Sequence, residues 1–553
     1  MILKYCTLDR FPHRLIIFCC ILSLLHSVHF FNLNPSAAAD SACNKRKYES
    51  GIVCVCNSSY CDEYTPVGRL PNEKVVIFTS SESGKRFLKS HTVFVRDGIC
   101  VAKSFRKQLL YGGGPEDEDL ISVEIYSTKQ FQKILGFGGA FTDAAGININ
   151  RLSLGARTKL LEAYYSEKGI EYSLGRVPIA SCDFSTREYS YLDTPDDFEL
   201  KTFALAQEDY ELKIPFIRSA LEMTKGQFRL LASPWSAPGW MKTIGQMKGG
   251  GKLKGDIGGM YFKTYAKYFV RFFEEYAKSG IDFWGLTIQN DPAFGADEYY
   301  PWQAMYYSHE MQSRVQYPRM YPLVDLKILA HDAERTILLE AAEKIYDTNP
   351  SENSYVDGLA IHWYMKAPHS TMTKAHEMQP DKFILASEAC NGFMPEDPSV
   401  ILGDWGRGEA YGHDIIQTLR NWVVGWLDWN ICLDEKGGPN WVGNFVDAPI
   451  IVNGTSDEFY KQPMYYFLGH FSKFLRPDSI RMETNVKGEC HTSTGEGYVE
   501  AVAVVTAENQ HVLVIHNRDT VDHNVLVRDS AISGKIVIFS MEPKSISTLV
   551  WNL

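Results

Sequence analysis

The sequence has no excess of basic charge. It contains 56 Lys and Arg residues against 67 Asp and Glu residues, which gives a formal net charge of −11 at pH 7. Nothing gathers the basic residues into a face that could neutralise a phosphate backbone, and this argues against nucleic acid as a partner. The chain also lacks an internal repeat. Its one low-complexity tract is the Gly/acid run 112–119, which we interpret as an exposed loop.

The motifs of metal and nucleotide enzymes are incomplete. Gly136-Phe137-Gly138 lacks the third glycine of a dinucleotide-binding fingerprint, and no Walker A run is complete. His309-Glu310 and His376-Glu377 have no second histidine at the spacing of a zinc protease. We therefore expect neither a bound metal nor an organic cofactor.

Long hydrophobic runs are absent after the N-terminus. There, positive charges up to Arg14 precede an apolar run over 15–31, and Ala37-Ala38-Ala39 follows. This pattern is typical of a cleaved export signal over residues 1–39. A signal anchor is the alternative, because the run approaches spanning length. We favour cleavage, since histidines interrupt the run, and we expect a mature chain without a transmembrane span.

The cysteines agree with export to an oxidising compartment. Cys43, Cys54, Cys56 and Cys61 crowd the start of the mature chain and indicate two small disulfides. A zinc knuckle is the alternative, but no histidine accompanies the four cysteines. The other cysteines of the mature chain are odd in number, which leaves at least one thiol unpaired. They are Cys100, Cys182, Cys390, Cys432 and Cys490.

Two glycosylation sequons point to the same compartment. Asn57-Ser58-Ser59 and Asn453-Gly454-Thr455 match the N-x-S/T acceptor pattern, which is used only in the secretory route. We therefore expect glycans at Asn57 and Asn453 and entry of the chain into the secretory pathway.

The chain has 553 residues, and this length predicts two or three domains. The hydrophobic pattern changes twice along it. From residue 40 to about 126 short strand-like runs lie between turn residues. After Phe131, buried strands alternate with amphipathic helices such as 260–278, and from about 476 the pattern is alternating β again. The middle part predicts parallel strands with crossover helices, as in a (β/α)8 barrel. We expect the early and late β segments to join into one sheet domain.

Two apolar runs lead into a carboxylate. Residues 383–387 (FILAS) run into Glu388, and residues 283–288 (FWGLTI) run into Gln289-Asn290-Asp291. Chemistry in a (β/α)8 barrel is done at the carboxyl ends of the strands, so these acids suggest a glycosidase pair. One carboxyl would protonate the leaving oxygen and the other would attack the sugar carbon. Taken singly, each acid could instead cap a helix or lie in a surface turn.

Other strand ends carry groups that bind sugars. Carboxylates and amides bind hydroxyl groups, and an indole offers a flat apolar face to a sugar ring. A single Trp at a strand end is more often a packing residue, but the recurrence of such groups at successive strand ends favours a binding site. The groups are Arg176, Asp183, Trp235, His362, Tyr364 and Trp429.

Longer runs resemble one enzyme family. They are 136–145 (GFGGAFTDAA), 176–185 (RVPIASCDFS), 193–198 (DTPDDF), 387–390 (SEAC), 437–445 (GGPNWVGNF) and 461–474 (KQPMYYFLGHFSKF). In these runs the chain resembles the lysosomal glucosylceramidases, the acid β-glucosidases of glycoside hydrolase family 30. The likeness extends over essentially the whole mature chain, including the cysteine cluster and the sequon at Asn57.

The resemblance implies a fold of three parts. The (β/α)8 catalytic barrel would be joined by an accessory β-sandwich and by a small antiparallel β sheet that carries the disulfides. The implied disulfides join Cys43 to Cys54 and Cys56 to Cys61. The implied boundaries are 40–66 plus 431–462 for the small sheet, 67–126 plus 476–553 for the sandwich, and 127–430 plus 463–475 for the barrel.

The resemblance also implies retaining hydrolysis of glucosylceramide to glucose and ceramide. The reaction would take place at a membrane surface in the lysosome, helped by a saposin-like activator protein and anionic lipid; secretion is the alternative destination. Glu388 falls on the family's nucleophile. The positions that hold glucose correspond to Asp183, Trp235, Asn290, Trp429 and Asn444, and the polar network around the nucleophile corresponds to Arg176, His362 and Tyr364.

One position departs from the family pattern. The family's acid/base residue is a Glu in an Asn-Glu-Pro run, whereas this chain has Asn290-Asp291-Pro292. Asp is shorter by one methylene, which withdraws its carboxyl by roughly 1.5 Å. A retaining site places its two carboxyls about 5–5.5 Å apart, and a misplacement of about 1 Å can lower the rate about a hundredfold.

We therefore expect a slow retaining β-glucosidase in which Glu388 attacks the anomeric carbon and Asp291 is the acid/base. A pseudoenzyme that binds glucosylated lipid or a secretory-pathway partner is the alternative. Its only support is the Asp at position 291, and the retained Glu388 speaks against it. Within the hydrolase hypothesis, a β-xyloside, a β-galactoside or a steryl glucoside stays open as substrate.

Overall fold

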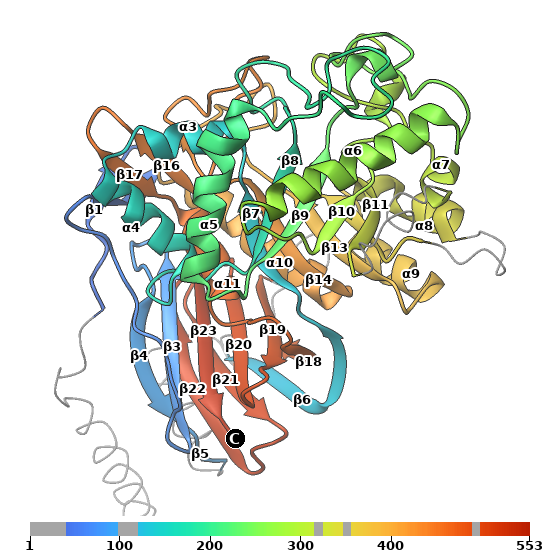
Figure 1. Cartoon of the computed structure of the whole chain (residues 1–553). Helices are drawn as coiled ribbons and strands as arrows, with labels where there is room; N and C mark the ends of the chain where they lie inside the picture. Colours follow the sequence, from blue (N-terminus) through green and yellow to red (C-terminus); the bar gives the residue numbers. More distant parts are fainter. Residues whose placement is uncertain (1–39, 98–119, 315–324, 347–354, 489–497) are drawn as a thin grey trace, which may run out of the picture.

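Eight parallel strands close into a barrel, and two further β sheets pack against its helices (Figure 1). The computed structural model describes residues 40–97, 120–314, 325–346, 355–488 and 498–553. The expected export signal, the Gly/acid run 112–119, Cys100 and Cys490 lie outside the described residues.

The barrel strands are the apolar runs of the middle of the chain. Strands such as β8, β12 and β13 are buried over almost their whole length, because the helices cover the outside and the interior is filled. They pair in the order β10-β11-β12-β13-β14-β7-β8-β9, and β9 closes onto β10. Their bounds are β7 Gly136–Ala140, β8 Leu174–Ile179, β9 Arg229–Pro234, β10 Gly285–Thr287, β11 Lys327–Glu334, β12 Gly358–His362, β13 Phe383–Glu388 and β14 Val423–Asn430.

Branched aliphatic side chains fill the interior of the barrel. One small cluster takes residues from six of the strands, so that the barrel is a packed core rather than a channel. Its buried members are Leu174, Leu231, Leu329, Ala360, Leu385 and Leu427. The polar strand ends therefore stand above an apolar floor.

Helices follow most of the barrel strands. In α6 (Met260–Ala277) the buried Phe262, Tyr265, Phe269 and Phe272 recur every three or four residues, which places them on one face against the sheet. No Gly or Pro interrupts this helix, in agreement with the predicted 260–278. The others are α3 Asp143–Asn150, α4 Leu154–Tyr165, α5 Ile214–Met223, α7 His309–Ser313, α8 Leu338–Tyr346, α9 Ser370–Met378, α10 Trp405–Arg420 and α11 Pro463–Ser472.

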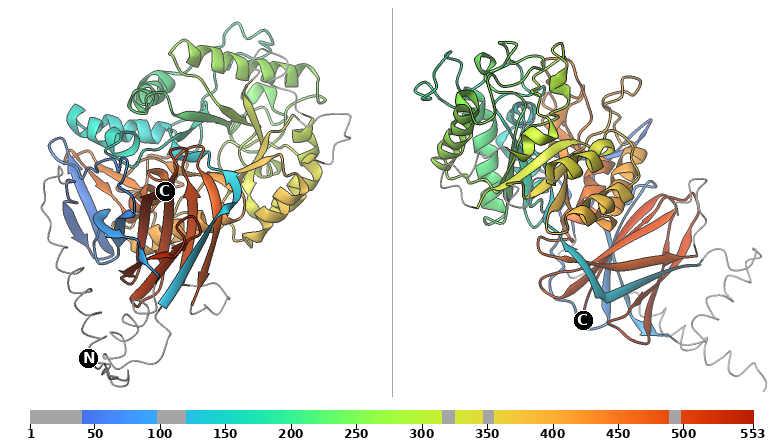
Figure 2. Two further views of the ribbon diagram at one scale, coloured as in Figure 1. Left: turned by 90° about the horizontal axis from the view of Figure 1, so that it is seen from below. Right: turned by 90° about the vertical axis from the view of Figure 1, so that its right-hand side faces the viewer.

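The early and late β segments form one ten-stranded sheet, as expected, and it lies below the barrel in Figure 1 and in the right-hand view of Figure 2. Its order is β4-β3-β23-β20-β19-β18-β6-β21-β22-β5. Strand β6 continues past residue 126 and leads directly into β7. The bounds are β3 Lys74–Ser81, β4 Leu88–Val93, β5 Val95–Arg96, β6 Leu120–Lys133, β18 Ile480–Lys487, β19 Val499–Val505, β20 Gln510–Asn517, β21 His523–Asp529, β22 Lys535–Met541 and β23 Ser545–Asn552.

The small sheet joins the start of the described chain to residues after the barrel strands. Its order is β1-β2-β17-β16-β15; the first four strands pair antiparallel, and β15 runs parallel to β16. The bounds are β1 Lys45–Tyr48, β2 Gly51–Asn57, β15 Leu433–Asp434, β16 Ile450–Asn453 and β17 Glu458–Lys461.

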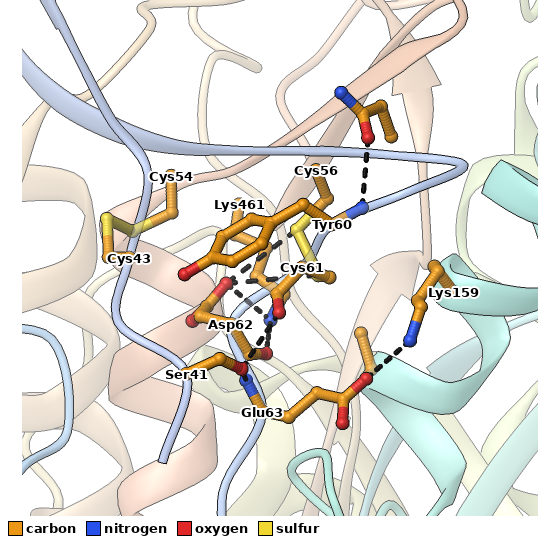
Figure 3. The surroundings of a disulfide bond; sticks show 12 residues. Ser41, Cys43, Cys54, Cys56, Tyr60, Cys61, Asp62, Glu63, Lys159 and Lys461 are labelled. Atoms are coloured by element: carbon orange, nitrogen blue, oxygen red, sulfur yellow. Dashed lines mark hydrogen bonds and ion pairs between the residues drawn. A yellow bond between two sulfur atoms is a disulfide. The ribbon is translucent and has the colours of Figure 1, made fainter. Parts of the chain in front are cut away.

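Both disulfides that the resemblance implied are present, Cys43–Cys54 and Cys56–Cys61 (Figure 3). Next to them the buried Lys461 ammonium donates to a carboxylate oxygen of Asp62 at 2.9 Å and to its backbone carbonyl at 3.0 Å. This ion pair links the disulfide segment to the end of β17. Among the described residues, Cys182, Cys390 and Cys432 are free thiols, and all three are buried.

The ten-stranded sheet is attached to the barrel through helices α10 and α11. The buried His470 of α11 lies 2.9 Å from the Ser80 hydroxyl of β3 and 2.8 Å from the Thr548 hydroxyl of β23. Within the part of the chain that the structure describes, no helix combines the length and the apolarity needed to cross a bilayer.

Candidate active site

Arg176, in β8, lies at the centre of the polar groups at the carboxyl ends of the strands. Its guanidinium is fully buried and donates to Glu388, to the side-chain oxygen of Asn290 at 2.8 Å and to Asp332 at 2.8 Å. Its Nε donates to the Ser233 hydroxyl at 3.0 Å. One planar cation thus connects strand ends on opposite sides of the barrel, a geometry that suits Arg better than Lys.

Glu388 occupies the tip of β13, as the sequence predicts. Its exposed fraction is 7 %, and both carboxylate oxygens are held. Oε2 accepts from Arg176, and Oε1 accepts from the Tyr364 hydroxyl at 2.8 Å. These two donors fix the direction of the carboxylate.

Asp291 lies in the loop that follows β10. Its side chain is 20 % exposed, so it is more open than that of Glu388. The carboxylate accepts from Asn290 Nδ2 at 3.1 Å and lies 3.4 Å from His362 Nδ1. Since Arg176 binds both Asn290 and Glu388, the two predicted acids lie at the same end of the barrel on either side of one guanidinium.

Asp332, in β11, is a member of the site that the sequence reading missed. It is fully buried and receives Arg176 at 2.8 Å, the Ser387 hydroxyl at 2.7 Å and His362 Nε2 at 3.2 Å. A β-bulge between His331 and Ala333 shifts the pairing of the strand here. The ionisable residues His331, Asp332 and Glu334 at the end of this strand were a usable signal, because a buried charge needs partners.

The backbone at this end of the barrel is strained. Ala180, Asp291, His331 and Asp332 have φ values of 64°, 44°, 74° and 44°, in the left-handed region that non-glycine residues rarely adopt. Such residues persist only where surrounding contacts hold them, and they gather at functional sites. The strained positions lie beside the acids that the sequence singled out.

Charges of alternating sign form a chain across the site. Burial disfavours a charged imidazole, but the negative charges of Asp291 and Glu388, with the hydrogen bond to Asp332, outweigh it and raise the pKa of His362 well above its usual value. Burial opposes the ionisation of Asp332 as well, and the Arg176 and His362 cations nevertheless lower its pKa. The order along the chain is Glu388, Arg176, Asp332, His362 and Asp291.

Two indoles line the same region. The rings of Trp235 and Trp429 stack with centroids 5.2 Å apart and an interplanar angle of 19°. The Arg176 guanidinium lies 5.1 Å from the Trp235 centroid and 5.5 Å from that of Trp429, within the range of a cation–π contact. These aromatic groups therefore also pack around the central cation.

Asp183 is tied to the loop that carries Asn444. Its carboxylate accepts from Asn444 Nδ2 at 3.0 Å and from Asn440 Nδ2 at 3.4 Å. Asn440 lies within the GGPNWVGNF run, but the sequence reading did not single it out. Burial, with the nearby charge of Glu388, raises the pKa of Asp183 to about 7, although the two amides act in the opposite direction.

The raised carboxyl pKa values predict a protein that is more stable in mild acid. Burial likewise raises the pKa of Asp447 to about 6, against the effect of Arg407. An unfolded Asp titrates near pH 3.9, so from about pH 4 to 7 the folded chain holds protons that the unfolded chain has released. The stabilisation that these two carboxyls contribute is fully present below pH 4 and is lost as the pH rises through 6 and 7. The free energy of unfolding should fall by a few kcal/mol between pH 5 and pH 7.5.

Thermal unfolding of Asp183→Asn and Asp447→Asn at several pH values checks this. In each variant Tm should decrease less above pH 5 than it does in the wild type. Asp256→Asn, on an exposed loop, should show the same decrease as the wild type. If the wild type and all three variants showed the same dependence of Tm on pH, Asp183 and Asp447 would not be its cause. Below about pH 4 stability should fall again, because the pKa values of Asp332 and Asp414 are lowered by their cationic partners despite burial.

The two sequon asparagines lie on either side of Glu458 in the small sheet, since Asn57 and Asn453 both pair with it. The Asn57 side-chain oxygen accepts from the backbone N–H groups of Ser59 and Tyr60. Asn453 Nδ2 lies 3.2 Å from both Glu435 and the Tyr460 hydroxyl. Both therefore stand at one end of this sheet.

In the described ranges, one group of side chains could supply three metal ligands, namely Cys56, Cys61 and Asp62. Its two sulfur atoms form a disulfide, so they are not thiolates that could bind a metal. Glu388, Asp332 and Asp291 have Arg or His partners instead.

Family models match both large parts of the chain. The glycosyl hydrolase family 30 TIM-barrel domain matches residues 134–475, and the glycosyl hydrolase family 30 β-sandwich domain matches residues 478–549. The two matches together cover the barrel and the C-terminal strands of the ten-stranded sheet.

Similar proteins extend over nearly the same length. Putative glucosylceramidase 3 of Caenorhabditis elegans is 40% identical over 549 residues, which are 97% of this chain and 98% of that protein. Lysosomal acid glucosylceramidase of Mus musculus is 42% identical over 488 residues, 87% of this chain and 90% of that protein. Among solved structures, SrfJ from Salmonella typhimurium superposes with a TM-score of 0.74 and 28% identity, covering 87% of this chain and 100% of its own.

Proposed function

Because this chain belongs to glycoside hydrolase family 30 and is a glucosylceramidase-like hydrolase, we propose that it cleaves glucosylceramide to glucose and ceramide with retention of configuration. The observation that carries the proposal is that Glu388 lies at the same end of the barrel as Asp291. There Glu388 accepts hydrogen bonds from Arg176 and Tyr364. Two carboxyls across one sugar linkage are what a retaining glycosidase needs.

In the first step the Glu388 carboxylate attacks the anomeric carbon of the glucosyl group. Asp291, in its protonated form, transfers its proton to the glycosidic oxygen as the bond to ceramide breaks. Ceramide leaves as the neutral alcohol, and glucose remains bound to Glu388 as an ester. The contacts of Glu388 support this role, since both of its oxygens are oriented before substrate arrives.

In the second step Asp291, now a carboxylate, takes a proton from water. The water oxygen attacks the anomeric carbon, the ester bond to Glu388 breaks, and β-glucose is released. The greater exposure of Asp291 suits a group that must meet a leaving alcohol and then a water molecule. Arg176 stays beside Glu388 throughout and offsets the charge of the carboxylate as it is released.

The glucose would be held by side chains that surround the acids. Asp183, Asn290 and Asn444 offer a carboxylate and amides to the sugar hydroxyls, and Trp235 and Trp429 offer ring faces. Hydrogen bonds to the sugar that strengthen as oxocarbenium charge develops would lower the barrier further.

The short side chain of Asp291 should make the acid/base step slow. His362 Nδ1 lies 3.4 Å away, and in the described structure this buried nitrogen has no hydrogen-bond partner. This supports a carboxyl that is withdrawn from its neighbour. A Glu at this position would extend the carboxyl by roughly 1.5 Å.

We further propose that the enzyme works in the lysosome at a membrane surface, with a saposin-like activator and anionic lipid as helpers and with glycans at Asn57 and Asn453. The disulfides and the likeness to the mouse lysosomal enzyme support the secretory route. Secretion from the cell is the alternative destination.

Incubation of the purified protein with glucosylceramide at acidic pH tests the proposed function. Ceramide and glucose should appear with the wild type and not with Glu388→Gln. A mechanism-based cyclitol epoxide should label Glu388 covalently, and the modified residue can be identified by peptide mass spectrometry. If neither product nor label appears, the result favours the alternative, a pseudoenzyme that binds glucosylated lipid without turnover.

A further inference from the structure

We propose that Asp332 is a positioning residue that fixes both carboxylates of the catalytic pair. It would position Glu388 through Arg176 and Ser387, and Asp291 through His362 and through its own backbone carbonyl. The proposal rests on the proposed function, because it concerns how that site is assembled. Asp332 is fully buried beneath these groups, so it acts through its neighbours rather than on the sugar.

The contacts of Asp332 on the nucleophile side come from two directions. Its Oδ2 accepts from Arg176 Nη2 at 2.8 Å, while Nη1 of the same guanidinium binds Glu388. Its Oδ1 accepts from the hydroxyl of Ser387, the residue that precedes Glu388, at 2.7 Å. Removing the carboxylate would take away one of the anchors of Arg176 and would leave Ser387, at the end of β13, without this acceptor.

The contacts on the acid/base side are made by the same Oδ1 that binds Ser387 and by the main chain. Oδ1 lies 3.2 Å from His362 Nε2, and Nδ1 of this imidazole lies 3.4 Å from the Asp291 carboxylate. The Asp332 carbonyl accepts from the backbone N–H of Asp291 at 2.9 Å. A single residue therefore positions the loop that carries Asp291 as well as the side chain beside its carboxyl.

The backbone explains how one strand residue reaches so many partners. The bulge at His331–Ala333 and the left-handed φ of Asp332 interrupt the regular pleat of β11. The conformation is strained for a non-glycine residue, and the ion pair with Arg176 and the bonds to Ser387 and His362 hold it in place.

The charge balance gives Asp332 a role that a neutral residue could not fill. The groups that face it are the cations Arg176 and His362 and the acids Glu388 and Asp291. Removing one negative charge from this cluster should favour ionisation of the two remaining carboxyls, so both should titrate at lower pH. A residue that only supports the fold would not have this effect.

Asp332→Asn tests the proposal, because it keeps the shape of the side chain and removes the charge. We expect kcat/KM on an aryl β-glucoside to fall about 10²-fold through loss of alignment. Both limbs of the pH profile should move to lower pH by on the order of one unit. Covalent labelling of Glu388 by the cyclitol epoxide should slow to a similar extent.

Two matched variants keep this test decisive. Asp414→Asn removes a buried carboxylate with the same kinds of partners, since Asp414 binds Arg335 at 2.6 Å and lies 3.4 Å from His369. Arg335 meets the site at the His362 backbone carbonyl, 3.3 Å away, and not at either acid. Asp414→Asn should lower Tm without moving the pH limbs. Ser387→Ala removes one hydrogen bond to Asp332 but no charge, so it should reduce the rate and leave the limbs in place.

If both limbs of the pH profile stay in place in Asp332→Asn and Tm falls as it does in Asp414→Asn, the role of Asp332 is purely structural and the proposal is overturned. That result is distinct from failure of the proposed function, in which the wild type itself would neither turn over the glucoside nor react with the epoxide. If Asp332→Asn does not fold, Asp332→Glu serves instead. This variant keeps the charge and shifts its position, so we expect a lower rate with unmoved limbs, and a rate equal to that of the wild type would contradict positioning.

Discussion

Glu388→Gln should lower the turnover of an aryl β-glucoside by more than about 10⁴-fold, as expected when a group that acts as part of a catalytic unit is removed. The glutamine keeps an oxygen that can accept from Arg176 or Tyr364, so the packing of β13 should survive. What is lost is the negative oxygen that forms the bond to glucose. Steady-state kinetics, with Tm as the check of folding, measures the effect.

Glu396→Gln, on an exposed loop after β13, is the matched control and should have wild-type rates. The proposed role of Glu388 can also be tested by rescue. With Glu388→Ala and an activated aryl glucoside, azide should attack the anomeric carbon as the aryloxide leaves, and the product should be the α-glucosyl azide. Near-normal turnover by Glu388→Gln would mean that another group is the nucleophile.

Asp291→Glu should raise kcat/KM about a hundredfold on substrates with poor leaving groups, such as alkyl glucosides and glucosylceramide. The extra methylene moves the acid toward the glycosidic oxygen, where proton transfer requires heavy atoms about 2.6–3.2 Å apart. A dinitrophenyl glucoside needs no proton on its leaving oxygen. For that substrate the rate of formation of the glucosyl ester should hardly change.

Asp291→Asn is the companion variant, because it removes the proton donor at nearly constant size. It should lower turnover of alkyl glucosides by about 10²–10⁴-fold, the usual contribution of general acid–base catalysis. The slow-acid hypothesis would be wrong if Asp291→Glu gave no gain on alkyl glucosides. It would also be wrong if the wild type cleaved alkyl and dinitrophenyl glucosides equally fast, since the Asp would then be well placed.

The strand ends could be predicted from sequence because their pattern is local. Residues 383–387 form a mostly apolar run that must be buried, and the carboxylate that follows it, Glu388, must lie at the barrel mouth. The same reasoning located Asp291, although β10 itself is only Gly285–Thr287. Joining of the early and late β segments also followed from their alternating pattern, because each alone would leave an apolar face uncovered.

Asp332 and Asn440 escaped prediction for different physical reasons. Asp332 lies inside a strand whose bulge changes which side chains point inward, and no local pattern reveals a bulge. Asn440 contacts Asp183 across a separation in sequence of more than 250 residues. The small sheet likewise depends on long-range pairing, and its second half was assigned only through the family resemblance.

That pairing has a consequence for biosynthesis. Strand β2 finds its partner β17 roughly 400 residues later in the chain, and β3 pairs with β23 at the C-terminus. While the barrel is being made, the first strands to leave the ribosome have open edges that can pair with other chains. A chain cut short by even its last strand would keep the Cys43–Cys54 and Cys56–Cys61 loops but lose the partner that covers β3. Premature stop codons near the 3′ end of the message should therefore yield aggregated protein rather than an active, shortened enzyme.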